Sequence, residues 1–333
     1  MTDFLAELGT ALDKACATVP HRELAASVDR LISRYRDPHP ASAPILASAT
    51  DTIAYAAYRM PATLAAVRSV LAQLVTLNPD FQPGTLLDLG GGTGAAVWAA
   101  AELFPSLASA TVFDQATEAL RLGGKLAVPT EAAALRSAQW KRGTFSDLGN
   151  LGVADLVTIS YVLSELTAAD QANLVTRAAA TGSSTIAVIE PGTPDGHRRI
   201  LAARGILIAA GYNIVAPCPH QHRCPLAEGA DWCHFAARVN RSPLHRRLKG
   251  GDLAYEDEKF SYVVASRSAQ EPASGRILRH PLKRKGLVTL QLCRRTDDVT
   301  QVVVSKRQGA TYRRARDVEW GESWPPHALV GEG

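Results

Sequence analysis

The chain has 333 residues, of which 46% are hydrophobic and 20% are charged, a balance typical of soluble globular proteins and sufficient for a large core. No run of 18 or more apolar residues occurs, so no membrane-spanning segment and no membrane partner are expected. The first residues include Asp3, Glu7 and Asp13, which is unlike a secretory signal or a transit peptide, and a monomeric cytoplasmic protein is predicted.

The positive charge is concentrated in the last third of the chain. Residues 235–333 hold 19 of the 36 Lys and Arg residues but 11 of the 32 Asp and Glu residues, so the preceding part is net negative. A basic segment of this kind indicates a polyanionic partner, and nucleic acid is favoured over a solvated basic surface without a ligand.

Residues 1–76 are predicted to form a helical cap, because their apolar side chains recur at helical spacing. Leu24, Val28 and Leu31 mark one helical face, and a second face follows in the segment that contains Pro61. Pro61 is expected near the start of that second helix, where its missing N–H is harmless.

Residues 77–268 alternate between short apolar runs and helical segments. Strands are predicted at 85–90, 110–115, 154–163 and 184–192, and helices at 94–104, 116–126, 167–180 and 195–210. This order predicts a doubly wound, Rossmann-like α/β sheet, closed by an antiparallel pair at 212–217 and 260–267. Asp195 is expected to cap the last of these helices.

The segment 269–333 is predicted to be a small basic β domain. Strands are expected at 286–293, 299–306 and 311–320. Small barrels often bind oligonucleotides. Basic residues in this domain and in the loop before it are therefore candidates for RNA contact through phosphates: Arg246, Arg247, Lys249, Lys283, Arg284, Lys285, Arg313 and Arg314.

A glycine-rich turn follows the first predicted strand and opens a helix. Gly90, Gly92 and Gly94 lack the Cβ atoms that would keep a ligand away from the backbone. Asp88 precedes them, where a carboxylate disfavours a pyrophosphate but suits the cationic amino-acid end of S-adenosylmethionine. Asp114 ends the next strand, where it can accept both ribose hydroxyls. The combination resembles the class I S-adenosylmethionine-dependent methyltransferases; a dehydrogenase or a turn without a ligand is the alternative.

The other cofactor contacts and the catalytic groups are less marked. Ser160 lies in the predicted strand 154–163, and Thr144 stands where methyltransferases often place an acid for the adenine amino group. Tyr161 and Glu165 lie at the carboxyl end of this strand, where the methyl acceptor normally lies in this fold, and for Glu165 the start of the next helix is the favoured explanation. Motifs of amino-group and cytosine methylation are missing. A methyltransferase fold is therefore predicted, and catalysis is left open.

Four of the five cysteines lie in the C-terminal half: Cys218, Cys224, Cys233 and Cys293. Three of them belong to a cysteine-rich insertion at 218–259. In a reducing compartment, clustered thiols more often hold a metal or an iron–sulfur cluster than a disulfide. The spacing matches neither a zinc ribbon nor a ferredoxin motif, so zinc, with His220, His222 or His234 as further ligands, and a cubane cluster both stay open. Buried cysteines without a ligand are the alternative.

Five segments carry a more specific resemblance than the glycine turn alone. They are AYAAYRMPATLAAVR (54–68), LLDLGGGTGAAVWAA (86–100), SYVLSEL (160–166), IEPGTPDGHRRILAAR (189–204) and the cysteine-rich stretch that ends in EDEKFSYVV (218–264). Together they resemble the methyltransferase-like proteins of the mitochondrial small ribosomal subunit and their bacterial relatives. The resemblance implies association with the small subunit and its rRNA during assembly, and a [4Fe-4S] cluster on Cys218, Cys224, Cys233 and Cys293.

These observations lead to three functional hypotheses. The first is an S-adenosylmethionine-binding, iron–sulfur-containing assembly factor that binds small-subunit rRNA. The second is an active rRNA methyltransferase. The third is a small-molecule methyltransferase with a structural zinc, which the basic C-terminal segment disfavours.

Overall fold

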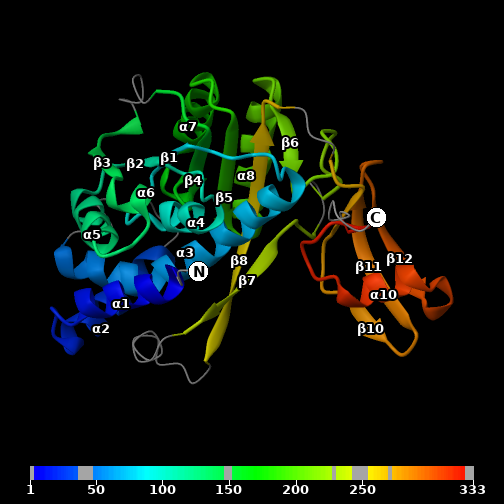
Figure 1. Cartoon of the computed structure of the whole chain (residues 1–333), viewed down its shortest axis with the longest axis horizontal. Helices are drawn as coiled ribbons and strands as arrows, with labels where there is room; N and C mark the ends of the chain where they lie inside the picture. Colours follow the sequence, from blue (N-terminus) through cyan, green and yellow to red (C-terminus); the bar gives the residue numbers. More distant parts are fainter. Residues whose placement is uncertain are drawn as a thin grey trace.

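The chain folds around a mixed sheet covered by helices, with a second, smaller sheet beside it (Figure 1). The computed structural model describes residues 4–36, 48–145, 152–226, 230–241, 254–268 and 272–326. Three of the candidate RNA contacts, Arg246, Arg247 and Lys249, lie outside these residues.

The N-terminal region is helical, as predicted, and consists of α1 (Phe4–Cys16), α2 (His21–Arg36) and α3 (Ala49–Leu77). Ser48 caps α3 by accepting a hydrogen bond from the N–H of Asp51 at 3.0 Å. The expected position of Pro61 is wrong, because α3 begins twelve residues before it and Pro61 lies inside the helix. The prediction failed because the packing of α3 against the rest of the fold stabilises the helix on both sides of the proline.

Helix α3 is long and apolar enough to cross a membrane, by length and composition alone. Its side chains Leu64, Val67 and Leu71 are fully buried and join the main hydrophobic core. The helix contacts α4, β7 and β8 of the sheet domain. Each fully buried side chain of this size contributes about 1.5–3 kcal/mol. Within this fold, α3 is therefore a core helix.

The large sheet has eight described strands in the order β3-β2-β1-β4-β5-β8-β6, with β7 also pairing with β8. Its strands are β1 (Thr85–Leu89), β2 (Ser109–Asp114), β3 (Gln139–Arg142), β4 (Leu156–Ser160), β5 (Thr185–Pro191), β6 (Asn213–Ala216), β7 (Phe235–Asn240) and β8 (Tyr255–Ser266). The first five are parallel, and β8 runs antiparallel to β5, β6 and β7. The predicted α/β sheet with a closing antiparallel pair is thus confirmed.

Helices cover both faces of this sheet (Figure 1). They are α4 (Ala95–Leu103), α5 (Thr117–Ala127), α6 (Ala133–Arg136), α7 (Ala168–Ala180) and α8 (Pro194–Ala209). Residues of β1 alternate between two cores: Leu86 packs with α3 and α4, whereas Leu87 and Leu89 pack with α7 and α8. Successive strand residues point to opposite faces, which explains the near-continuous apolar runs of the sequence.

The C-terminal segment forms the smaller sheet, with β9 (Gly275–Ile277), β10 (Leu282–Arg284), β11 (Leu287–Arg294) and β12 (Val299–Ser305). The strand expected at 311–320 is wrong, because the chain there forms helix α10 (Ala310–Asp317). Tyr312, Ala315 and Val318 recur every three residues and pack on this sheet, while the arginines between them are exposed. That spacing is helical, and Arg and Ala favour helices.

Candidate functional site

The glycine turn (residues 90–94) joins β1 to α4 through three glycines in the left-handed region. Gly90, Gly92 and Gly94 have φ angles of 70°, 53° and 82°, which side chains with a Cβ rarely adopt. A Cβ on Gly90 would lie 2.5 Å from Cγ2 of Val162, and one on Gly94 would lie 2.6 Å from the ring of Trp140. Gly92 has no such neighbour. Two glycines therefore permit close packing, and the middle one leaves the backbone open.

A pocket lies beside this turn, where β1, β4 and α3 meet. Its lining includes the turn itself, Asp88 and Ser160, and side chains of α3: Tyr55, Met60 and Thr63. Oδ1 of Asp88 accepts a hydrogen bond from Thr158 Oγ1 at 2.7 Å, whereas Oδ2 of Asp88 and Oγ of Ser160 are buried without a partner among the described residues. Buried polar atoms nearly always have partners, so these two atoms indicate a polar ligand.

The environment of Asp88 changes its acidity. The side chain is 1% exposed, and burial raises its pKa to about 7, an effect that the Thr158 hydrogen bond opposes and the charge of Asp114 reinforces. A cationic ligand group beside Oδ2 would favour the ionised carboxylate.

The other two predicted cofactor residues do not line this pocket in the described part of the chain. Asp114 accepts hydrogen bonds from the N–H groups of Gly92, at 2.9 Å, and Ala116, at 2.7 Å. Its carboxylate therefore stabilises the conformation of the glycine turn. Thr144 is exposed after β3. The structure thus brings together Asp88, the turn and Ser160, and leaves Thr144 outside.

Tyr161, which lines the pocket, belongs to a polar network that the sequence did not reveal. Tyr161 has a φ of 60°, rare for a residue other than glycine, and its hydroxyl donates to Oε1 of Glu258 at 3.1 Å. Arg59 of α3 donates to both oxygens of Glu258, at 3.0 and 3.2 Å. Burial, and then the charge of Glu258, raise the pKa of Tyr161 well above its ordinary value, so its hydroxyl is a hydrogen-bond donor. Glu165, the other catalytic candidate, is exposed and lies outside the pocket lining in the described residues.

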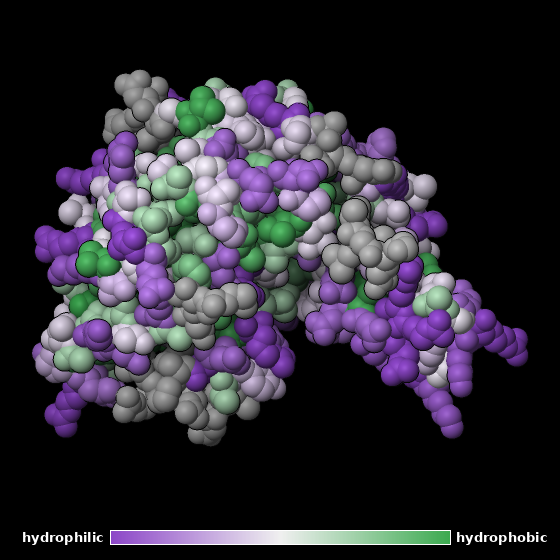
Figure 2. Space-filling view, viewed as in Figure 1, coloured by the Kyte–Doolittle hydropathy of each residue, from purple (hydrophilic) through white to green (hydrophobic). Residues whose placement is uncertain are grey.

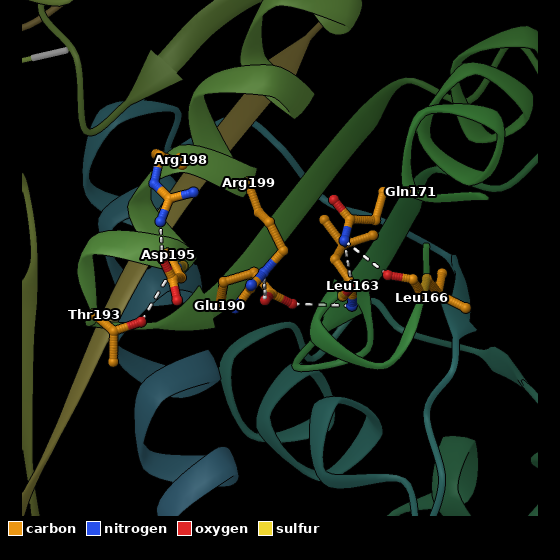
Figure 3. A network of polar contacts seen from close by, with 9 residues as sticks. Leu163, Leu166, Gln171, Glu190, Thr193, Asp195, Arg198 and Arg199 are labelled. Carbon is orange, nitrogen blue, oxygen red and sulfur yellow. Dashed lines mark hydrogen bonds and ion pairs between the residues drawn. The ribbon is translucent and has the colours of Figure 1, made fainter. Parts of the chain in front are cut away.

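Glu190 is the last residue but one of β5 and is fully buried, and both of its carboxylate oxygens have partners (Figure 3). Oε1 accepts a hydrogen bond from the N–H of Leu163 at 3.0 Å, and Oε2 pairs with Nε of Arg199 at 2.6 Å. Gln171 adds hydrogen bonds to the carbonyls of Leu163 and Leu166, both at 2.9 Å. Glu190 therefore fastens the turn after β4 to α8.

The start of α8 differs from its prediction. Thr193 caps the helix by accepting a hydrogen bond from the N–H of Gly196 at 3.1 Å (Figure 3). The expected cap, Asp195, is wrong, because this residue lies in the first helical turn and pairs with Arg198 on the surface. Pro194 sits between them at the first helical position, which suits a residue without an N–H.

A second cavity, here called the cysteine cavity, brings four thiols together. Its walls come from α8, the loop after β6, β8 and the smaller sheet, and the cysteines that line it are Cys218, Cys224, Cys233 and Cys293. Cys293 lies on β11 and is 8% exposed, whereas the three loop cysteines are half-buried. The fifth cysteine, Cys16, is buried in α1, outside this cavity.

The cavity favours neutral thiols as long as nothing binds them. Burial, and then Cys218 and Cys224, raise the pKa of Cys293 to about 12, and burial and the other three thiols raise that of Cys233 well above its usual value. In the described ranges, no group of three or more His, Cys, Asp or Glu side chains is close enough to hold one metal ion. The thiols share one cavity without converging on a single point.

The histidines near the cysteines differ in position. His220 lines the cavity, with Nε2 at 3.5 Å from Sγ of Cys293. His222 and His234 are not among the lining residues in the described chain, and the ring of His234 stacks on Trp232. Two buried arginines, Arg204 and Arg276, also line the cavity. Arg204 was missed in the sequence, and Arg276, which belongs to a basic run expected to contact rRNA, is buried here instead.

The predicted RNA contacts that the structure describes lie on the smaller sheet and α10. Lys283 and Arg284 are on β10, Lys285 is in the turn after it, and Arg313 and Arg314 are on α10. All five are exposed, and none forms an ion pair with a described residue. The lobe that carries them presents a mostly hydrophilic face (Figure 2).

Comparison with known proteins gives one family and several relatives. The model of the family described as mitochondrial small ribosomal subunit Rsm22 matches residues 49–325. The human mitochondrial ribosome assembly protein METTL17 is 28% identical, covering 82% of this chain and 62% of its own length. The Rsm22-cox11 tandem protein 2 of Schizosaccharomyces pombe is 25% identical, covering 87% of this chain and 46% of its own. Among solved structures, an O-methyltransferase family protein from Burkholderia thailandensis matches with a TM-score of 0.44 and 13% identity, covering 75% of this chain and 70% of that one.

These relatives correct one prediction. The cytoplasmic location expected from the acidic N-terminal residues is wrong by this comparison, because the names of the relatives place them in mitochondria. The present chain spans about 62% of the length of the human relative and about 46% of the fission yeast relative.

Proposed function

The chain belongs to the Rsm22 family of the mitochondrial small ribosomal subunit, and from that premise we propose that it is a methyltransferase-like assembly factor for the small ribosomal subunit. In this proposal it binds S-adenosylmethionine, holds a [4Fe-4S] cluster and contacts rRNA through its C-terminal lobe. One observation carries the proposal: Cys293, from the smaller sheet with its exposed basic residues, lines the same cavity as the three loop cysteines.

The thiols of the cysteine cavity supply a complete ligand set for a cluster. Tetrahedral zinc holds sulfurs at about 2.3 Å from one centre, so four thiolates must converge. In a cubane cluster each iron takes one thiolate, and the four sulfurs stay further apart. The four thiols of the cysteine cavity, three from the loop after β6 and one from β11, match the number of thiolates that such a cluster takes. Its role here would be structural, joining the smaller sheet to the loop.

The pocket beside the glycine turn supports S-adenosylmethionine as ligand. Asp88 offers a buried carboxylate oxygen without a partner among the described residues, and Gly92 leaves the backbone accessible. The cofactor carries an ammonium and a sulfonium, which the ionised carboxylate would attract. Bound there, it would supply a transferable methyl group.

The affinity for S-adenosylmethionine is expected to rise with pH. Because the pKa of Asp88 is about 7 in the free protein, the carboxyl is mostly protonated at pH 5.5, and binding must displace that proton. The dissociation constant should therefore fall roughly tenfold between pH 5.5 and 7.0 and level off above. Calorimetric titration across this range measures it.

Asp88→Asn is the control, since its weaker binding should not depend on pH in this range. An unchanged slope in this variant would remove Asp88 from the cofactor site.

The effect of pH on the stability of the free protein has the opposite sign to its effect on the affinity for S-adenosylmethionine. The native carboxyl keeps a proton that the unfolded chain loses near its ordinary pKa, so Asp88 makes the free protein less stable as pH rises towards 7.

Ribosome binding tests the proposal as a whole. The full chain should cosediment with isolated small subunits, and the association should weaken steeply as salt rises, because phosphate contacts release counterions. Changing Lys283, Arg284 and Lys285 together to Gln should lower the salt slope by up to about one per lost phosphate contact. The matched control changes three exposed basic residues outside the C-terminal lobe, Arg22 on α2 and Arg121 and Lys125 on α5, to Gln. It should leave the salt slope unaltered.

Association that ignores salt, or that both triple variants weaken equally, would contradict the rRNA contact. The second candidate, an active rRNA methyltransferase, is favoured by the pocket beside the glycine turn and disfavoured by Tyr161, whose hydroxyl is engaged with Glu258. Labelled methyl transfer to small subunits from a strain without this gene separates the two. Label in rRNA makes the protein an enzyme, and binding without label makes it an assembly factor.

A further inference from the structure

Two arginines are buried against the cysteine cavity. Arg276 is 1% exposed and Arg204 is 6% exposed, and both line the cavity with the four cysteines. Neither forms an ion pair with a carboxylate among the described residues. A buried charge without a countercharge is strongly disfavoured, so two of them at one cavity call for an anion.

Arg276 is tied to its place from three sides. It lies on β9 directly opposite Cys293 on β11, so both side chains stand on the same face of the smaller sheet. Nε donates to the carbonyl of Pro217 at 2.9 Å, and Nη1 donates to the carbonyl of Gly321 at 2.7 Å and to Gln73 of α3. Nη2 is buried and has no partner in the described part of the chain.

Arg204 is held in a similar way from the opposite wall. It lies on the face of α8 that lines the cavity, one turn beyond Ile200. Nη2 donates to the carbonyls of His220 and His222, at 2.8 and 2.9 Å, and so orders the loop between Cys218 and Cys224. Its Nε is buried and lacks a partner among the residues that are described.

The surroundings offer little other negative charge. The acidic residues of the turn after β11 are Asp297, which is exposed, and Asp298, which pairs with Arg294. An exposed acid is screened by water and compensates a buried guanidinium poorly. The thiols themselves become the compensating charge when a metal binds them as thiolates.

We infer that Arg204 and Arg276 are positioning residues for the metal centre: they neutralise the negative charge of its thiolates and offer Arg204 Nε and Arg276 Nη2 as donors to its sulfurs. The inference rests on the cluster proposed above. Net charge and hydrogen bonds to the sulfurs set the reduction potential of an iron–sulfur cluster. Positive charge at the cavity favours the reduced form, which carries one more electron.

The test uses the anaerobically purified full chain and its reduction potential, which a purely structural arginine would not move. In Arg204→Met, and in Arg276→Met, the ratio of reduced to oxidised cluster at a fixed potential should fall at least tenfold, a shift of about 59 mV for a one-electron couple. Iron loss to a chelator should be faster by a similar factor. Arg204→Lys keeps the charge and should restore most of the potential. Arg198→Met, on the exposed face of α8, should match the wild type.

The outcomes separate this inference from the proposed function. A wild-type protein without iron and acid-labile sulfide would refute the cluster and the inference together. A loaded wild type whose Arg→Met variants keep the same potential and iron retention would refute the inference alone. If Arg276→Met does not fold, the test rests on the comparison of Arg204→Met with Arg204→Lys. If both variants lower the reduction potential equally, the charge of Arg204 is not the cause and the inference is refuted.

Discussion

Replacing Cys293 by Ser is expected to remove the proposed [4Fe-4S] cluster and to destabilise the C-terminal lobe. Cys293 is the one cavity cysteine that the smaller sheet supplies, so its loss would remove the link that the proposed cluster makes between that sheet and the loop. Structural metal sites contribute on the order of 10 kcal/mol of apparent binding free energy, and a loss of at least about 3 kcal/mol in the free energy of unfolding is expected. Iron and acid-labile sulfide per chain, followed by denaturant unfolding, measure both effects.

Cys16→Ser is the matched control for this substitution. Cys16 is also buried, at 5% exposure, but it lies in α1 away from the cysteine cavity. The same change there places a hydroxyl in an apolar site, which costs about 1–3 kcal/mol and should leave iron and sulfide at wild-type levels. A Cys293→Ser protein that keeps its full metal content would take this residue out of the ligand set.

The sequence predicted the features that depend on neighbouring residues. The parallel strands were predicted because strands buried on both faces need continuous apolar runs, such as those around Asp88 and Ile159. The glycine turn was predicted because its residues are adjacent in the chain and their positive φ angles need glycine. Errors came where local patterns conflict with packing, as in α10 and at Pro61.

The features that the sequence did not predict join residues far apart in the chain. Arg59 and Glu258 are 199 positions apart, and Arg276 contacts Gln73 across 203 positions. Single charged residues at such distances leave no periodicity and no motif, and only the folded chain selects which of the many arginines meets which acid. The cysteines were an exception. Because the chain has only five of them, the residue type alone was enough to group Cys293 with the three cysteines of the distant loop.

The buried pair of Glu190 and Arg199 gives a second large effect. Changing Glu190 to Gln should lower the free energy of unfolding by about 3 kcal/mol, because it removes one partner of a buried ion pair and leaves the guanidinium without its countercharge. This loss is small for a broken buried ion pair, because the Arg199 side chain is 19% exposed and water can partly solvate its charge. Gln can still accept the hydrogen bond from the N–H of Leu163. Chemical denaturation of both proteins measures the difference.

A neighbouring pair on the same helix provides the control. Asp195 and Arg198 are 65% and 72% exposed, and Asp195→Asn should cost no more than about 1 kcal/mol. A double-mutant cycle combines Glu190→Gln with Arg199→Met. The double variant should lose clearly less free energy of unfolding than the two single variants together, because it no longer contains the unpaired charge of Arg199. A mild Glu190→Gln phenotype, equal to that of Asp195→Asn, would contradict the structural role.

That contrast also bears on function. If Glu190 holds the turn after β4, its loss lowers stability and affects the pocket beside the glycine turn only through Tyr161, two residues before Leu163. If Glu190 instead acted on a substrate, Glu190→Gln would abolish methyl transfer at unchanged stability. Both oxygens of Glu190 are engaged, with Leu163 and Arg199, and Glu190 does not line the pocket beside the glycine turn in the described part of the chain, so we expect the first result.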